Sequence, residues 1–356
     1  MCPERDNGTA YCLESLGAAG IVPSSLALIP AVISERRQQT RIIGLWGGAG
    51  GAAAALGPVL GGALVSGSGW RAAFWINIPL IATVIFLGQR VLALSRAEKT
   101  ACLDLLGLLL SVVGLALVAY VIINMHSSEL SPAAQAILVV AAVSIVALFL
   151  FVETKARMPM LPIKLFSSSK FAVACAVGLI LNFSFFGQLF ALSLYFQNYL
   201  RFEAWKAGLA LAPQACSAIV AAPLGGRYSA RIGEVRVIVM GLVAGAIGFA
   251  GLTFFQPSTP YILIALSTFL GGFGMAFAMP AATSMAVHAA PADYAGSASG
   301  VVNCLRQIGN LLGFALLGSL VAGDEFLHGF HSVGLGASVA FAAAIGLCAV
   351  VVLFKH

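Results

Sequence analysis

Long apolar runs, separated by short polar segments, dominate the pattern along the chain. A helix that crosses a bilayer needs about 20 consecutive, mostly apolar residues. Eleven runs of this kind predict an all-α integral membrane protein with about eleven transmembrane helices. The runs cover residues 13–33, 42–65, 72–93, 103–123, 133–153, 171–199, 207–226, 236–255, 260–286, 297–322 and 332–354.

The basic residues predict how these helices are oriented, because cytoplasmic loops of membrane proteins are enriched in Lys and Arg. When the loop after the first run is placed in the cytoplasm, fourteen basic residues fall on that side and four on the other. The bias predicts a multi-pass protein of the inner (plasma) membrane. Its N-terminus is expected outside and its C-terminus in the cytoplasm.

Composition agrees with a lipid-covered surface and argues against other classes. The chain is 60% hydrophobic and 9% charged, whereas globular proteins are about 25% charged. The net charge of +6 does not indicate nucleic acid, because the basic residues lie between apolar runs. The seven Cys form no CxxC pair, His328 and His331 are expected in a loop, and we expect no metal and no cofactor. Enzyme motifs such as H-E-x-x-H, G-x-S-x-G and the P-loop are absent, so the sequence does not indicate an enzyme.

One apolar stretch, RIIGLWGGAGGAAAALGPVLGGALVSGSGWRAAFWINIPL, is unusually rich in glycine. Small residues let helix backbones approach closely, and Pro58 is expected to bend the helix. The stretch therefore predicts a seam where two helical bundles slide or seal. Ordinary tight packing of membrane helices is the alternative.

The same stretch resembles the antiporter motif in the fifth span of drug:proton antiporters of the major facilitator superfamily. The motif positions here are Gly44, Ala53, Gly57, Pro58, Gly61 and Gly62, with Ala53 in place of a family glycine. The following GWRAAFWINIPL resembles the entry to the sixth span, and GVVNCLRQIGNLLG resembles the thirteenth span of the fourteen-span branch. From about Leu13 onward, the chain is similar to this multidrug-resistance efflux group.

The resemblance implies a division of the chain. Residues 1–12 do not fit the family, 13–93 correspond to the last three spans of the N-terminal bundle, 94–170 to two extra linker spans with cytoplasmic loops, and 171–356 to a six-span C-terminal bundle. Spans one to three have no counterpart in this interpretation. The implied function is drug or small-molecule efflux by proton antiport with alternating access, hence antibiotic resistance. A non-transporting membrane remnant, a partner subunit completed by a separate fragment, and another small organic solute stay open as alternatives.

A second motif, GGRYSARIG, resembles a cytoplasmic loop that braces the closed gate of the family with charge pairs. Gly226, Arg227, Arg231 and Gly233 match it, but Ala230 replaces its Asp. The two arginines then need another partner, such as Glu234, unless they merely follow the cytoplasmic charge bias. Proton coupling also needs a titratable group within the membrane, and none of the thirteen Asp and Glu lies mid-span. Protons are therefore expected as partners only if the missing spans complete the carrier.

Substrate should bind near the midplane between the bundles. Asn182, Phe186, Ser193 and Gln197 share roughly a 60° arc of one predicted helix. Asn303, Arg306, Gln307 and Asn310 form a polar stripe on another, and Gln214 follows a kink expected at Pro213. An aromatic and amide wall favours a small lipophilic or cationic substrate. The alternatives are that the Phe side chains face lipid, that the amides bond neighbouring helices and that Arg306 snorkels to headgroups.

Overall fold

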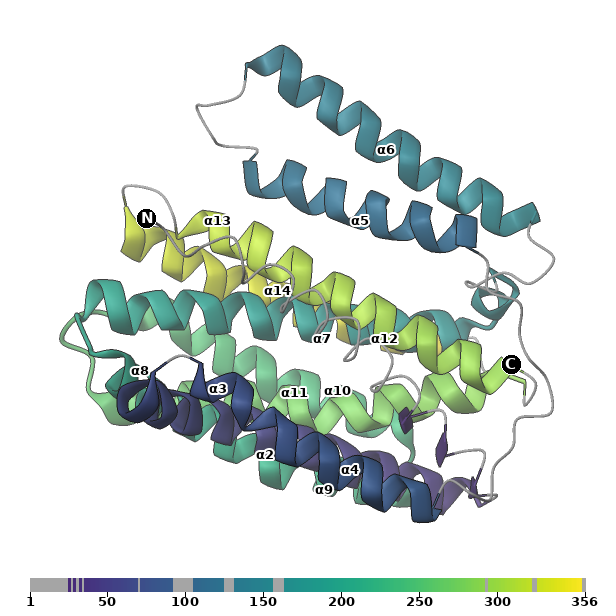
Figure 1. Cartoon of the computed structure of the whole chain (residues 1–356), viewed down its shortest axis with the longest axis horizontal. Coiled ribbons are helices and arrows are strands. Elements are labelled where there is room, and N and C mark those ends of the chain that lie inside the picture. The colour runs from purple at the N-terminus through teal and green to yellow at the C-terminus, as the bar shows by residue number, and fades with distance from the viewer. Residues whose placement is uncertain are drawn as a thin grey trace.

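The structure, a computed structural model, describes residues 25–26, 28–29, 32–33, 35–69, 71–91, 105–124, 131–155, 163–291, 294–321 and 325–353, and these form helices and connections without a strand (Figure 1). The first helices are α2 (Arg36–Ser68), α3 (Ala72–Trp75), α4 (Asn77–Val91), α5 (Leu105–Asn124), α6 (Pro132–Lys155) and the short 3₁₀ turn η2 (Ile163–Ser167). The remainder are α7 (Ser169–Leu194), η3 (Tyr195–Tyr199), α8 (Ala204–Ala210), α9 (Ala212–Ile232), α10 (Glu234–Gly251), η4 (Leu252–Phe254), α11 (Tyr261–Ala289), α12 (Ala295–Leu312), η6 (Gly313–Leu317), α13 (Gly318–Leu320) and α14 (Phe326–Leu353).

These helices confirm the predicted class, an all-α multi-pass membrane protein. Ten of the eleven predicted runs coincide with described helices, and the first, 13–33, lies largely outside the described residues. Within the described part, six helices are long and apolar enough to cross a membrane, and two shorter helices are also apolar. Helix α14 begins earlier than predicted, so His328 and His331 lie in its first turns and not in a loop.

The helices fall into three groups in Figure 1. Helices α7 and α9 to α14 pack into a bundle, in which α11 contacts α7, α9 and α10. Helix α2 lies along α9, at the bottom of the view, and also contacts α11. The hairpin of α5 and α6 lies at the top and contacts α12 and η6 through α5. The predicted boundaries at residues 93 and 170 remain predictions.

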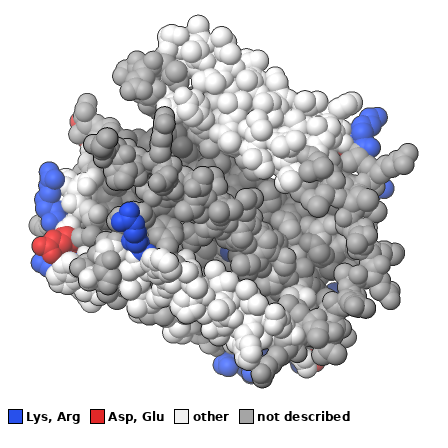
Figure 2. Space-filling model, in the orientation of Figure 1, with Lys and Arg blue, Asp and Glu red and all other residues white. Residues whose placement is uncertain are grey.

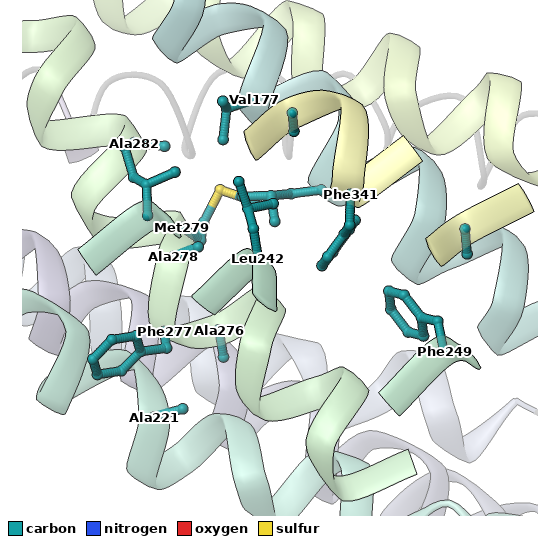
Figure 3. Packing of buried hydrophobic residues seen from close by; sticks show 14 of the residues in the cluster. Val177, Ala221, Leu242, Phe249, Ala276, Phe277, Ala278, Met279, Ala282 and Phe341 are labelled. Carbon is teal, nitrogen blue, oxygen red and sulfur yellow. The ribbon is translucent and has the colours of Figure 1, made fainter. Parts of the chain in front are cut away.

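The core of the bundle is made of apolar side chains packed around α10 and α11 (Figure 3). Leu242 and Met279 lie near its centre, and the rings of Phe249 and Phe341 meet edge to face at 4.9 Å. Many large hydrophobic side chains are exposed on the outside of the protein, and in Figure 2 few charged side chains can be seen, most of them toward the ends and the lower edge of the view. Such a surface is stable in contact with lipid and not with water.

Two helices are interrupted by π-helical turns. Helix α7 continues into η3 and α12 into η6, each with a π-helical segment of five residues. A π segment adds a residue to the turn and changes which side chains share a face. The regular 100° spacing assumed for residues 182 to 197 therefore fails at its C-terminal end.

Candidate functional site

The seam, the contact of α2 with α9 and α11, is closest at the N-terminal half of α2. A Cβ atom added to Gly44 would lie 2.8 Å from the Cα of Gly226, and one added to Gly226 would lie 2.7 Å from the Cα of Gly44. One turn further, a Cβ on Gly48 would lie 2.9 Å from the ring of Pro223. Only glycine permits this distance between the two backbones.

Four described glycines further along α2 make no such contact. A Cβ added to Gly50, Gly57, Gly61 or Gly67 would meet no atom within 4 Å in the described structure. Ala53 and Gly57 are exposed, and α2 stays helical through Pro58 and Gly62. The contact that the glycine-rich stretch predicted is thus made by its first glycines, whereas the later motif positions Gly57 and Gly61 make no close contact in the described structure.

A polar network crosses the seam at the same end of the molecule. We call it the gate network: Gln39 and Thr40 of α2, Glu234 of α10, and Ser284 and His288 of α11. His288 Nδ1 lies 2.8 Å from Glu234 Oε1, and His288 Nε2 lies 3.0 Å from Gln39 Oε1. The hydroxyls of Thr40 and Ser284 are 2.8 Å apart, and Ser284 donates to Glu234 at 2.9 Å. Three helices are therefore joined by side-chain hydrogen bonds where the seam is tightest.

The predicted gate-loop residues lie beside this network. Gly226 forms the seam, and Gly233 links α9 to α10 with φ of 94°, a conformation that favours glycine. Arg227 and Arg231 are exposed. The backbone carbonyl of Ala230 accepts a hydrogen bond from Arg37 Nε at 3.3 Å. The suggested pairing of Glu234 with these arginines is wrong, because Glu234 binds His288 and Ser284 instead.

The candidate substrate residues of α7 and η3 do not form one uniform face. Asn182 is buried and donates to the carbonyl of Gly178 in its own helix at 2.8 Å, and Ser193 donates to Leu189 in the same way at 2.9 Å. Gln197, in the π segment, is exposed. Phe186 is half-buried, and its ring contacts those of Phe185 and Phe314. Only the aromatic part of the predicted wall therefore extends across two helices.

The polar stripe of α12 contains an unsatisfied cation. Nε and Nη1 of Arg306 are buried without a hydrogen-bond partner among the described residues, as is Oδ1 of Asn310. The Arg306 stem packs on α7, since a Cβ on Gly178 would lie 3.5 Å from its Cγ. Asn310 donates to the exposed Gln307 at 2.8 Å, and Asn303 is half-buried. A buried guanidinium with free donors fits an anionic or carbonyl-bearing group.

Two buried glutamines complete the polar interior. Gln214 is 2% exposed, and neither atom of its amide has a partner in the described structure. It follows the break between α8 and α9, which confirms the interruption expected near Pro213. Gln188 of α7 is 1% exposed with a free amide nitrogen, and the predicted arc omitted it. A search for polar residues in apolar runs, without the one-face condition, would have included it.

The gate network was also absent from the prediction, because the search for titratable groups considered only carboxylates. His288 ends an apolar run, and Glu234 and Gln39 begin two others. These three run ends meet because α2, α10 and α11 pack together. The sequence of each run does not specify this packing. The described carboxylates, Glu35, Glu153, Glu203, Glu234 and Glu325, lie at or near helix ends, in agreement with the predicted absence of a mid-span acid.

Comparison with known proteins assigns the family. Residues 9–314 match the Major Facilitator Superfamily. The chain is 32% identical to "Multidrug resistance protein Stp" of Mycobacterium tuberculosis over 315 residues, which is 88% of this chain. It is 33% identical to the "Methylenomycin A resistance protein" of Streptomyces coelicolor over 340 residues, which is 95% of this chain. The chain belongs to the Major Facilitator Superfamily, a class of membrane transporters, as the sequence motifs predicted.

The solved structures agree on the fold. The crystal structure of the human organic anion transporter MFSD10 (TETRAN) superposes with a TM-score of 0.60 at 18% identity, covering 92% of this chain and 68% of that one. The chain is shorter than these relatives: it spans 58% of Stp and 70% of the S. coelicolor protein.

Proposed function

We propose that the chain functions as a secondary active carrier that exports drugs or other small organic molecules in exchange for protons. Its relatives are named for multidrug and methylenomycin A resistance. The observation that supports alternating access is the seam, where α2 and α9 meet backbone to backbone at Gly44 and Gly226, whereas Gly57 and Gly61, further along α2, have no atom within 4 Å of an added Cβ. Carriers of this fold move substrate by opening such a contact at one end while closing it at the other.

The closed end is proposed to face the cytoplasm. The ends of α2, α9 and α10 that meet there bear a group of exposed basic residues, and the positive-inside rule assigns such a group to the cytoplasmic side. These residues are Arg36, Arg37, Arg41, Arg227, Arg231 and Arg236. In this orientation the C-terminus is cytoplasmic and the N-terminus is outside, in the inner (plasma) membrane.

The substrate class is inferred from the aromatic and unpaired polar side chains of α7, α9, α12 and η6, among which Phe190 and Phe314 are exposed in the described structure. Phe186, Phe190 and Phe314 form a ring cluster shared by α7 and η6, with centroids 5.8 and 5.9 Å apart. Arg306, Gln188 and Gln214 supply polar groups without partners in the described structure. Aromatic area with a few fixed polar groups suits a lipophilic compound, and the free guanidinium favours one with a carbonyl or anionic oxygen over a purely cationic one.

The test is accumulation of a lipophilic dye that bears a carbonyl or anionic oxygen, with the cation ethidium for comparison, in bacteria that lack their own efflux pumps. Cells that express the chain should accumulate less dye than vector cells, and a protonophore should remove the difference. The matched control is Gly226→Trp, whose side chain prevents the seam from closing. Cells that express this variant should accumulate as much dye as vector cells. Equal accumulation, with the chain present in the membrane, would favour the second function below.

A second function, a non-transporting membrane component that acts only with another fragment, is supported by the carboxylates. Proton carriers use an acid within the membrane, and none of the described acids occupies such a place. Co-expression with a fragment that bears an acidic membrane span distinguishes the two functions: efflux that appears only with the second fragment supports this one.

A further inference from the structure

The gate network fixes the protonation state of His288. The amide nitrogen of Gln39 donates to the carbonyl of Ile33 at 2.6 Å, and a carbonyl can only accept. The amide is therefore oriented with Oε1 toward His288, 3.0 Å from Nε2. Since Oε1 also only accepts, the proton in this hydrogen bond belongs to Nε2 of the histidine.

The other ring nitrogen faces a carboxylate. Nδ1 of His288 lies 2.8 Å from Oε1 of Glu234, which accepts a further hydrogen bond from Ser284. An ionised carboxylate has no proton to donate, so Nδ1 must donate as well. With Glu234 ionised, both ring nitrogens then have hydrogens, and the imidazolium form satisfies both bonds.

We infer that His288 binds a proton that holds the seam closed. This inference rests on the proposed alternating-access function. The proton joins Glu234 and His288, in the C-terminal bundle, to Gln39 of α2 on the other side of the seam. Neutral imidazole has one N–H, so loss of the proton leaves one of the two acceptors without a donor. Opening the seam removes Gln39 from Nε2 and so favours release of the proton.

Glu234 is the charged group that contacts His288 in the described structure. The neighbouring helices α2, α9, α10 and α7 have basic residues near this end, and all are exposed to solvent, which screens them. They are Arg36, Arg37, Arg41, Arg227, Arg231, Arg236 and Lys170, and the acid Glu35, directly before α2, is exposed as well. Within α11 the nearest polar neighbour of the ring is Ser284, whose hydroxyl is 3.3 Å from Nδ1. The ion pair is half-buried, with 13% of the His288 and 25% of the Glu234 side chain exposed.

The direction of the pH effect follows from linkage. The closed seam binds the proton more tightly than the open one, because only the closed seam offers both acceptors. Closure is therefore favoured at low pH and weakened at high pH. This behaviour does not require an acid in the middle of a membrane span, because the carboxylate that it uses, Glu234, lies in the first turn of α10.

The test is the distance across the closed end as a function of pH, without substrate. Spin labels are placed at the exposed positions Gln38 of α2 and Ile232 of α9, in the full chain with its native cysteines replaced, and measured by double electron–electron resonance in nanodiscs. The ratio of short to long distances should fall roughly 10-fold from about pH 5.5 to about pH 8.5, as expected for one hydrogen bond to a charged group. His288→Gln should abolish this dependence.

Two further variants keep the inference falsifiable if His288→Gln does not fold. Gln39→Glu places a second carboxylate against Nε2. The midpoint, meaning the pH at which half of the change in the distance ratio has occurred, should move upward by about one pH unit. His331→Gln is the matched control, since His331 binds the carbonyl of Phe255 at 2.7 Å at the other end of α10 and should leave the midpoint unchanged. A distance ratio that does not depend on pH, or an unchanged midpoint in Gln39→Glu, overturns the inference. Dye efflux measured in parallel shows whether the transport proposal fails with it or stands alone.

Discussion

Gly44 of α2 and Gly226 of α9 face each other with no side chain between them. A Cβ added to Gly44 would lie 2.8 Å from the Cα of Gly226, and one added to Gly226 would lie 2.7 Å from the Cα of Gly44. The carbonyl of Thr40 is also within 3.0 Å of the Cβ position on Gly226. Because the obstructing atoms are backbone, they cannot move aside as a flexible side chain would. The distance between the two helices is therefore set by this pair.

The first prediction is that Gly44→Ala opens the seam. Overpacking of this kind costs about 1–3 kcal/mol, which shifts the ratio of closed to open molecules roughly 5- to 150-fold. Gly57→Ala, in the same helix, has no atom within 4 Å of the new Cβ and should leave the ratio unchanged. The distance between spin labels at Gln38 and Ile232 measures both. Equal distance distributions in the two variants would show that the glycine contact does not limit closure.

The seam shows what the sequence could and could not predict. The apolar runs predicted the helices, because a membrane span must satisfy its own backbone hydrogen bonds and be apolar over about 20 residues. The glycines predicted a close helix contact, but not that Gly44 and Gly48 make it while Gly57 and Gly61 do not. That difference depends on where α2 crosses α9, a tertiary property that the local pattern does not encode.

The candidate site was predictable in part, for the same reason. Arg306 was found because a cation within an apolar run is rare and costly. The wall from Asn182 to Gln197 assumed a regular helix, and the π segment at Tyr195–Tyr199 changes the register there. His288 was omitted because its role depends on Gln39, which is distant in sequence and adjacent only in the folded protein.

The second prediction concerns Arg306. Its Nε and Nη1 have no partner in the described structure, so Arg306→Ala removes an unpaired buried charge and should not destabilise the fold. If the guanidinium binds substrate, dye efflux or drug resistance should fall about 10-fold, the effect of losing a hydrogen bond to a charged group. The variant should remain in the membrane at normal amounts. Arg236→Ala is the control, because Arg236 is exposed and its one hydrogen bond within the described structure is to the carbonyl of Ile232, in the adjacent turn. Unchanged efflux in Arg306→Ala would exclude the substrate role and leave that of a bundle brace.

The third prediction compares two substitutions by their effect on stability. One removes a buried polar group that has no hydrogen-bond partner in the described structure, and the other removes one that has a partner. An unsatisfied buried amide costs about 1–3 kcal/mol, so Gln214→Met should raise the melting temperature of the purified protein by a few degrees. If Gln214 contacts substrate, the same change should alter the order of drugs to which resistance is seen. Asn182→Leu, which removes the hydrogen bond to Gly178, should give no comparable gain. A lower melting temperature for Gln214→Met would indicate that the amide has a partner in the folded protein.

The last prediction tests the contact between α7 and α12, which positions Arg306 and the ring cluster. A Cβ on Gly309 would overlap the carbonyl of Leu179, and one on Gly313 would overlap that of Phe183. Gly309→Ala should therefore force the two helices apart and destabilise the protein by about 1–3 kcal/mol. Gly300→Ala, in the same helix α12, meets no atom within 4 Å and should be neutral or stabilising by up to about 1 kcal/mol, since alanine favours the helix. Thermal unfolding of both variants in detergent gives the comparison.

Because α7 and η6 share the Phe186–Phe314 contact, Gly309→Ala should also reduce dye efflux at temperatures where it is still folded, whereas Gly300→Ala should not. Equal stability of the two variants would mean that α7 and α12 are not held at the distance that the structure shows.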